Sequence, residues 1–165
     1  MGADGPGENA RASAKLSALW TRIVVELDSK EIGGAGGVSV SSLGDVAEDI
    51  VAAVLVVEKF DDGSAGIAKR EAVVGARFPS KSSRIVLLDR AVEELAEEEL
   101  RAVLVREFFE GLAMYLNGPE HSLDLADDER EDEVDELMRE MGFEAEADLA
   151  ECLNAGWPLS ARPGR

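Results

Sequence analysis

The sequence has very little of the two side chains that most often bind zinc in proteins. It contains one cysteine, Cys152, so no disulfide can form within the chain. It contains one histidine, His121, which has no second histidine with which to share a metal ion. His121 follows a helix-ending Asn-Gly-Pro sequence at residues 117–119, so we expect it to lie in a surface loop.

Long apolar runs are also missing. The longest run, residues 50–57, is far shorter than the roughly 20 residues that a membrane-spanning helix needs. Residues 1–15 contain no apolar segment of the kind found in export signals. We therefore expect a cytoplasmic protein that does not enter a membrane.

Basic residues are scarce relative to acidic ones. The chain has 35 aspartates and glutamates against 17 lysines and arginines, and its formal net charge is -18. Such a surface repels the phosphates of nucleic acids and the anionic lipids of membranes. A protein, a basic peptide or cations are the partners that this charge favours. The acidic residues are also spread along exposed helix faces, where they promote solubility.

The length of the chain suits a single domain, because about 150 residues already bury about 68–70% of the unfolded surface. Residues 1–7 are rich in glycine and proline and are predicted to be disordered. Residues 8–155 are predicted to form one domain, and residues 156–165 an irregular tail. The glycine-rich segment at residues 33–37 lacks the spacing of nucleotide-binding loops and is predicted to be a flexible connector.

The first half of this domain mixes helical and strand patterns. Residues 8–20 have helical propensity. Residues 21–28 contain the β-branched run Ile23, Val24 and Val25 and are predicted to form a strand. Ser41 or Ser42 is expected to cap a helix that gives way to a strand before Val57. The turn sequence at residues 61–64 then predicts a hairpin between residues 55–60 and 65–74.

The stretch from Ser83 to Asn117 organises the rest of the chain. Residues 85–88 are predicted to form a buried strand, and a long amphipathic helix follows. We expect Phe108, Leu112 and Tyr115 to be buried against that strand. The apolar arc of this helix comprises Leu100, Leu104, Val105, Phe108, Leu112, Tyr115 and Leu116. Its polar side comprises Glu99, Arg106, Glu110 and Asn117, with Glu107 at the margin.

Two further helices are predicted after the loop that holds His121. Residues 127–142 carry an apolar stripe of Val134, Leu137, Met138 and Met141, and Gly142 is a natural C-cap. Residues 144–153 are predicted to form a last short helix.

The sequence RAVLVREFFE at residues 101–110, preceded by a strand reading IVL, resembles the active-site region of zincin metallopeptidases. In that family a strand ending in I-V-L often precedes a helix reading R-A-V-L-x-H-E-x-x-H. Glu107 matches the general-base position of that motif, while Arg106 and Glu110 stand where the two zinc-binding histidines would be. The resemblance covers residues 75–143 and includes a preceding hairpin with Gly75 and Phe78. It also includes an acidic helix in which Glu131 matches the third-ligand position.

The resemblance implies an α+β, zincin-like fold, in which a small mixed sheet with a hairpin packs on an active-site-type helix and a second helix. The replaced histidines imply that no zinc binds, because arginine stays protonated and has no lone pair to offer. An ion pair between Arg106 and Glu110 is expected, and no cofactor is predicted. Two interpretations of Glu131 remain open: it meets Arg106 inside the fold, or it faces water in the first turn of its helix.

The resulting hypothesis is a catalytically inactive, pseudo-metallopeptidase domain that acts as a binding or regulatory module. Its pseudo-active site would comprise Arg106, Glu107, Glu110 and Glu131, with no catalytic residue and no metal ligand. One alternative is an active metal-dependent hydrolase or peptidase with an atypical carboxylate site, which would suit Mg, Ca or Mn better than zinc. The other is an acidic interaction protein unrelated to peptidases.

Overall fold

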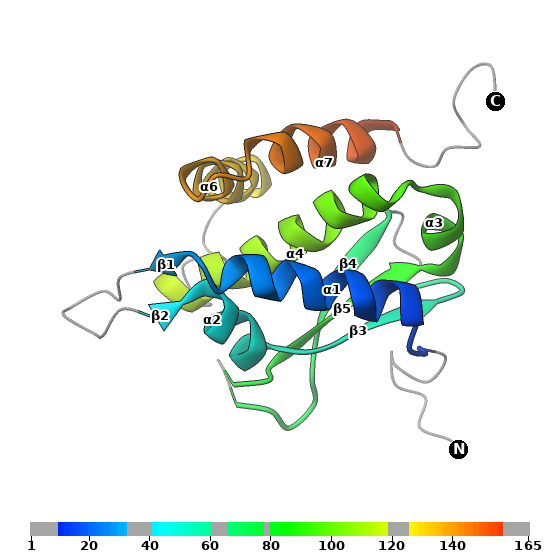
Figure 1. Ribbon diagram of the computed structural model, residues 1–165, viewed down its shortest axis with the longest axis horizontal. Helices are drawn as coiled ribbons and strands as arrows, with labels where there is room; N and C mark the ends of the chain where they lie inside the picture. Colours follow the sequence, from blue (N-terminus) through cyan, green and yellow to red (C-terminus); the bar gives the residue numbers. More distant parts are fainter. Residues whose placement is uncertain (1–9, 33–40, 61–65, 78–79, 119–125, 157–165) are drawn as a thin grey trace.

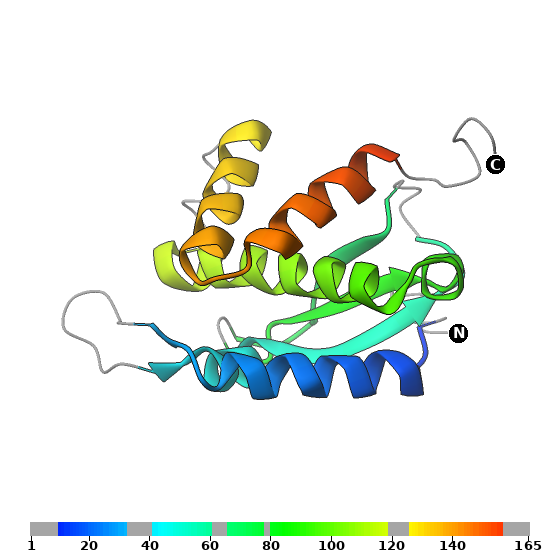
Figure 2. The same ribbon diagram turned by 45° about the horizontal axis from the view of Figure 1, so that its top comes forward.

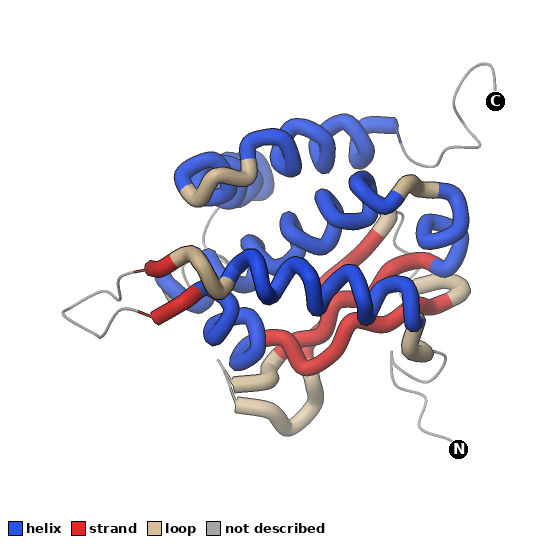
Figure 3. The backbone as a smooth tube through the Cα atoms, viewed as in Figure 1, coloured by secondary structure: helices blue, strands red, loops and turns tan. Residues whose placement is uncertain are grey.

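The structure, a computed structural model, describes residues 10–32, 41–60, 66–77, 80–118 and 126–156. Predictions for residues 1–7, the glycine-rich connector, the 61–64 turn, His121 and residues 157–165 lie outside this part of the chain. Within it the fold is α+β, with six helices, a three-stranded sheet and a short two-stranded sheet (Figures 1 and 3). The strands are β1 (Glu31–Ile32), β2 (Ser41–Ser42), β3 (Val51–Val57), β4 (Ala68–Ala72) and β5 (Ser83–Leu88). The helices are α1 (Ala14–Leu27), α2 (Leu43–Ile50), α3 (Asp89–Glu94), α4 (Glu97–Asn117), α6 (Asp127–Glu140) and α7 (Glu144–Gly156).

The three-stranded sheet is mixed, with the order β3-β5-β4. β5 pairs in parallel with β3 and antiparallel with β4. The predicted hairpin between residues 55–60 and 65–74 is wrong, because β5 separates the two strands. The physical reason is that Ile85, Val86 and Leu87 are all fully buried. A strand that is apolar on both faces belongs at the centre of the sheet.

A single helix, α1, covers the region predicted to be a helix followed by a strand at residues 21–28. The prediction of that strand is wrong, because Leu16, Leu19, Ile23 and Leu27 are buried at helical spacing. The β-branched residues at positions 23–25 favour a strand only weakly, and tertiary packing overrides this preference. Val25, the last of them, is 65% exposed on the outer side of the helix.

The transition between α2 and β3 follows the sequence prediction. The Ser42 side chain accepts a hydrogen bond from the Asp45 backbone N–H at 3.0 Å and caps α2. The helix ends at Ile50, and β3 begins at the next residue and runs to Val57. Ile50, the last residue of α2, therefore lies beside the start of β5. Its backbone C=O accepts a hydrogen bond from the Ser83 hydroxyl.

Helix α4 lies at the centre of the molecule. It contacts the sheet together with α1 on one side, and α6 and α7 cover its other side (Figures 1 and 2). The predicted apolar arc is confirmed at Phe108 and Leu112, which are fully buried, while Tyr115 is only half-buried. The predicted polar side is wrong at Arg106, which is buried, because α7 packs where solvent was expected.

The predicted helix at residues 127–142 corresponds to α6, and Gly142 has the positive φ of +91° that favours glycine after a helix. Val134 and Met138 from its apolar stripe are buried in the main core. The last helix, α7, is longer than predicted and extends to Gly156. In the described part of the chain, none of the helices combines the length and the apolar character that crossing a bilayer requires.

Candidate functional site

Four charged side chains meet where α4 faces β4. Arg106, Glu107 and Glu110 come from α4, and Arg70 comes from β4. The Nε atom of Arg106 lies 3.7 Å from Oε2 of Glu110, and Nη1 of Arg70 lies 3.8 Å from Oε1 of the same carboxylate. Glu110 is therefore shared by two guanidinium groups. We call these four residues the arginine–glutamate cluster.

The helical spacing of α4 and the register of the sheet bring this cluster together. Arg106 and Glu110 are one turn apart on α4, which is the spacing at which helical side chains meet. Arg70 lies opposite Ile85 in the pairing of β4 with β5. Since Ile85 belongs to the core beneath α4, Arg70 shares the sheet face that α4 covers.

The cluster becomes more exposed from Arg106 towards Glu110. The Arg106 side chain is 11% exposed, that of Arg70 19% and that of Glu110 34%. Beside Arg106 and Glu107 is a cavity of about 20 Å³, whose walls include Ile67, Val103 and Ala150. That volume suffices for about one water molecule. The interior end of the cluster is therefore closely packed by β4, α4 and α7.

Glu107 has the most perturbed carboxyl group of the cluster. Burial raises its pKa to about 8, and the negative charge of Glu110 adds to this increase. The positive charges of Arg70 and Arg106 act in the opposite direction but do not cancel it. Glu107 is thus mostly protonated at neutral pH. Two arginines then face one ionised carboxylate, so the cluster carries a local excess of positive charge.

Glu131, the fourth residue of the predicted pseudo-active site, lies apart from this cluster. It is on α6, its side chain is exposed, and the ion pair that Arg106 makes among the described residues goes to Glu110. The water-facing interpretation therefore describes Glu131 in this structure. The expected i,i+4 ion pair between Arg106 and Glu110 is present.

Arg70 is the member of the cluster that the sequence pattern did not indicate. Residues 65–74 are predicted to contain a strand, but the pattern alone does not show which of its residues face α4. The signal is the alternation of Ala68, Arg70 and Ala72, which places two small residues and one long cation on one face of β4. Recognising it requires knowing that β4 pairs with β5 and lies over α4.

The cluster does not fit the zinc ion that an intact zincin motif binds. Two guanidinium groups repel a divalent cation and offer it no lone pair. The carboxylate at the second histidine position, Glu110, is already paired with both arginines. Across the described residues, no group of three or more His, Cys, Asp or Glu side chains is arranged to hold a metal ion.

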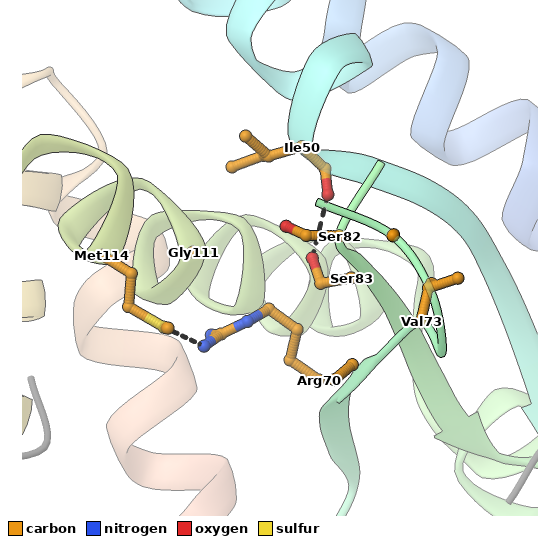
Figure 4. A pocket seen from close by; sticks show the side chains of 9 residues that line it. Ile50, Arg70, Val73, Ser82, Ser83, Gly111 and Met114 are labelled. Atoms are coloured by element: carbon orange, nitrogen blue, oxygen red, sulfur yellow. Dashed lines mark hydrogen bonds between the residues drawn. The ribbon is translucent and has the colours of Figure 1, made fainter. Parts of the chain in front are cut away.

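A larger pocket lies at the outer end of the cluster, between α4, β4 and the start of β5. It has a volume of about 390 Å³, within the range of about 300–1,000 Å³ typical of small-molecule sites. Figure 4 shows Arg70 reaching along α4 to Met114, where its Nη2 donates to Sδ at 2.6 Å. The pocket is lined by Ile50, Arg70, Ala72, Val73, Ala76, Ser82, Ser83, Gly111 and Met114.

Gly111 forms the part of the pocket wall that belongs to the middle of α4. A glycine inside a helix costs about 1 kcal/mol relative to alanine, so its presence calls for a packing reason. A Cβ atom at this position would lie 3.3 Å from Cδ1 of Ile50 and 3.5 Å from Cδ of Arg70. The glycine therefore lets Ile50 and the Arg70 stem approach the helix.

Comparisons with protein-family models, with curated proteins and with solved structures found no match to this chain.

Proposed function

We propose that this chain is a zincin-like domain without metal-dependent catalysis, and that it acts as a binding module. The observation that carries the proposal is the ion pair between the buried Arg106 and the partly exposed Glu110. These two residues stand at the positions that correspond to the two zinc-binding histidines of the family motif. A fixed guanidinium at the first position supplies the positive charge that a metal ion would supply in a zincin.

The charge balance of the cluster supports this proposal. In a zincin the general-base glutamate acts on metal-bound water. Here the equivalent carboxyl, Glu107, has a pKa raised to about 8 by burial and by Glu110, so at neutral pH it mostly holds its proton. The small cavity beside it has room for about one water molecule and none for a peptide.

The order of elements is a second line of support for the zincin-like fold. A strand pair, β4 with β5, precedes the central helix α4, and the acidic helix α6 follows it. Binding is supported by the 390 Å³ pocket, which shares Arg70 with the cluster. The alternative of a carboxylate metal site has weaker support, because Glu110 is paired and Glu107 is mostly protonated.

Peptide hydrolysis is the direct test of this proposal. The purified protein would be incubated with a mixture of unstructured peptides, with and without added Zn²⁺, Mg²⁺, Mn²⁺ or Ca²⁺, and the products analysed by mass spectrometry. We expect no cleavage under any of these conditions. The matched control is Glu107→Gln: cleavage that the wild-type protein performs and this variant does not would contradict the proposal. Cleavage that is equal in both would come from a contaminant.

A further inference from the structure

We infer that the pocket between Arg70, Gly111 and Met114 binds a small organic acid, with the ligand carboxylate on the Arg70 guanidinium and its apolar body along the Ile50–Val73 wall. This inference rests on the proposed binding role and names the class of ligand. It does not depend on whether the chain descends from a zincin.

Arg70 has more N–H donors than strong acceptors near it among the described residues. A guanidinium carries five N–H donors. Among the described residues, the acceptor at Nη2 is the Met114 thioether, and sulfur of this kind is a weak acceptor. The carboxylate nearest to Nη1, that of Glu110, is 3.8 Å away, beyond the hydrogen-bond limit of about 3.2 Å. Within the described part of the chain, Arg70 is thus held in place without a strong oxygen acceptor.

The Nε and Nη2 donors of Arg70 lie on the side of the guanidinium that faces the pocket. In any guanidinium, Nε–H and one Nη–H point to the same side and together bind a carboxylate through two parallel hydrogen bonds. In Arg70 the Nη2 side faces Met114, which lines the pocket, while Nη1 faces Glu110. A ligand carboxylate that displaces the Met114 sulfur would be held by Nε and Nη2, and the Glu110 ion pair would remain.

Gly111 borders the same side of the Arg70 guanidinium. A Cβ atom at Gly111 would lie 3.8 Å from Nε of Arg70, in van der Waals contact, so any side chain at this position would border the Nε side of the guanidinium. The rest of the lining is mostly apolar, and the Ser83 hydroxyl is already engaged with the Ile50 C=O at 3.0 Å. Arg70 is therefore the charged group that orients a ligand, and the apolar wall accepts its hydrocarbon part.

Local electrostatics favour an anion over a cation in this pocket. With Glu107 mostly protonated, Arg70 and Arg106 outnumber the single charge of Glu110. The negative charges elsewhere on the chain are screened over distances beyond about 8 Å at physiological ionic strength. The dipole of α4 does not contribute to anion binding here, because Gly111 lies inside the helix and not at its N-terminus.

Calorimetric titration with octanoate and phenylacetate is the test, with octanamide and octylammonium as probes of matched shape and different charge. We expect saturable binding of at least one of the two carboxylates and at least tenfold weaker binding of the amide and the ammonium ion. No binding of either carboxylate up to about 5 mM would overturn the inference, because it corresponds to an affinity weaker than about 1 mM. Binding of octylammonium in preference to octanoate would also overturn it.

Two variants locate the site. Arg70→Gln should weaken carboxylate binding by roughly 10- to 100-fold, the effect of losing a charged hydrogen bond. Gly111→Ala keeps the arginine and places a methyl group beside it, and it should weaken binding as well. The control is Arg22→Gln on α1, which removes a cation that is not part of the pocket and should leave binding unchanged. Carboxylate binding as tight as in the wild-type protein in a folded Gly111→Ala or Arg70→Gln variant would contradict this site.

Failure of this inference is distinguishable from failure of the proposed function. Absence of carboxylate binding leaves the non-catalytic interpretation intact, whereas peptide cleavage lost in Glu107→Gln overturns that interpretation whether or not carboxylates bind.

Discussion

Nη1 of Arg70 and Oε1 of Glu110 are 3.8 Å apart, although one residue lies on an edge strand and the other on the central helix. This ion pair joins β4 to α4 and ends the arginine–glutamate cluster on its more exposed side. It also connects the two parts of the candidate site, because Glu110 pairs with the buried Arg106 and Arg70 lines the 390 Å³ pocket.

The first prediction concerns the relative importance of Arg106 and Glu110. Glu110→Ala should lower the free energy of unfolding by up to about 3–5 kcal/mol, because it leaves the buried Arg106 without an ionised partner among the described residues. Arg106→Ala should cost less, because the carboxylate that it leaves behind is 34% exposed and still lies 3.8 Å from Nη1 of Arg70. Urea unfolding of both variants checks this order.

Arg106→Met serves as the control for this comparison, because it keeps the aliphatic stem and removes the charge. We expect its stability to lie between those of the wild type and Arg106→Ala. Equal stability of Arg106→Ala and the wild-type protein would show that Arg106 does not hold the cluster together.

The second prediction is a pH dependence due to Glu107. Its pKa is about 8 in the folded protein and 4.5 as an unperturbed carboxyl, so the folded state binds its proton more tightly. This contribution to stability is complete below pH 4.5, declines as the unfolded carboxyl ionises, and is lost as the pH rises through 8. The full shift corresponds to at most about 5 kcal/mol. We expect a smaller value than this limit, because Glu107 is only half-buried by its accessible surface.

Glu107→Gln should remove this part of the pH dependence, because glutamine mimics the protonated carboxyl. The measurement is the difference in unfolding free energy between variant and wild type from pH 5 to pH 9, where the variant should gain relative stability as the pH rises. Glu136→Gln, on the exposed side of α6, is the matched control. A difference that stays constant over this range would argue against a raised pKa of Glu107.

The third prediction concerns the aromatic contacts through α4. Phe108 is fully buried between Trp20 and Phe109, with ring centroids 6.3 and 5.2 Å away, and Phe109 continues to Phe143 at 5.4 Å. Phe108→Ala should therefore cost about 3–5 kcal/mol. Tyr115→Ala, at a half-buried position on the same helix, should cost clearly less. Similar losses in the two variants would mean that α4 is rotated relative to the structure.

The fold could be predicted from the sequence where one local signal dominates. Ser42 caps α2, Gly142 ends the α6 segment, and the run of Ile85, Val86 and Leu87 forms the buried strand as predicted. The strand predicted at residues 21–28 is wrong because burial of Ile23 and Leu27 at helical spacing outweighs the weak strand preference of the β-branched residues there. The second buried face of α4 could not be predicted, because it depends on where α6 and α7 pack.

The candidate site divides in the same way. The Arg106–Glu110 pair follows from helical spacing alone, so it was accessible from the sequence. Arg70 enters the site through strand order, which places β4 beside β5 rather than beside β3. Glu131 lies on a segment whose apolar stripe was predicted, yet its own position on the exposed side of α6 depends on how that helix docks.

Native mass spectrometry of the purified protein tests the central claim that guanidinium groups take the place of a metal ion. The protein would be incubated with zinc, dialysed, and measured with and without a chelator. Because Arg106 and Arg70 surround the carboxylate at the second histidine position, we predict the mass of the metal-free chain in both samples. A mass increment of one zinc per chain that survives dialysis and disappears with chelator would contradict the account.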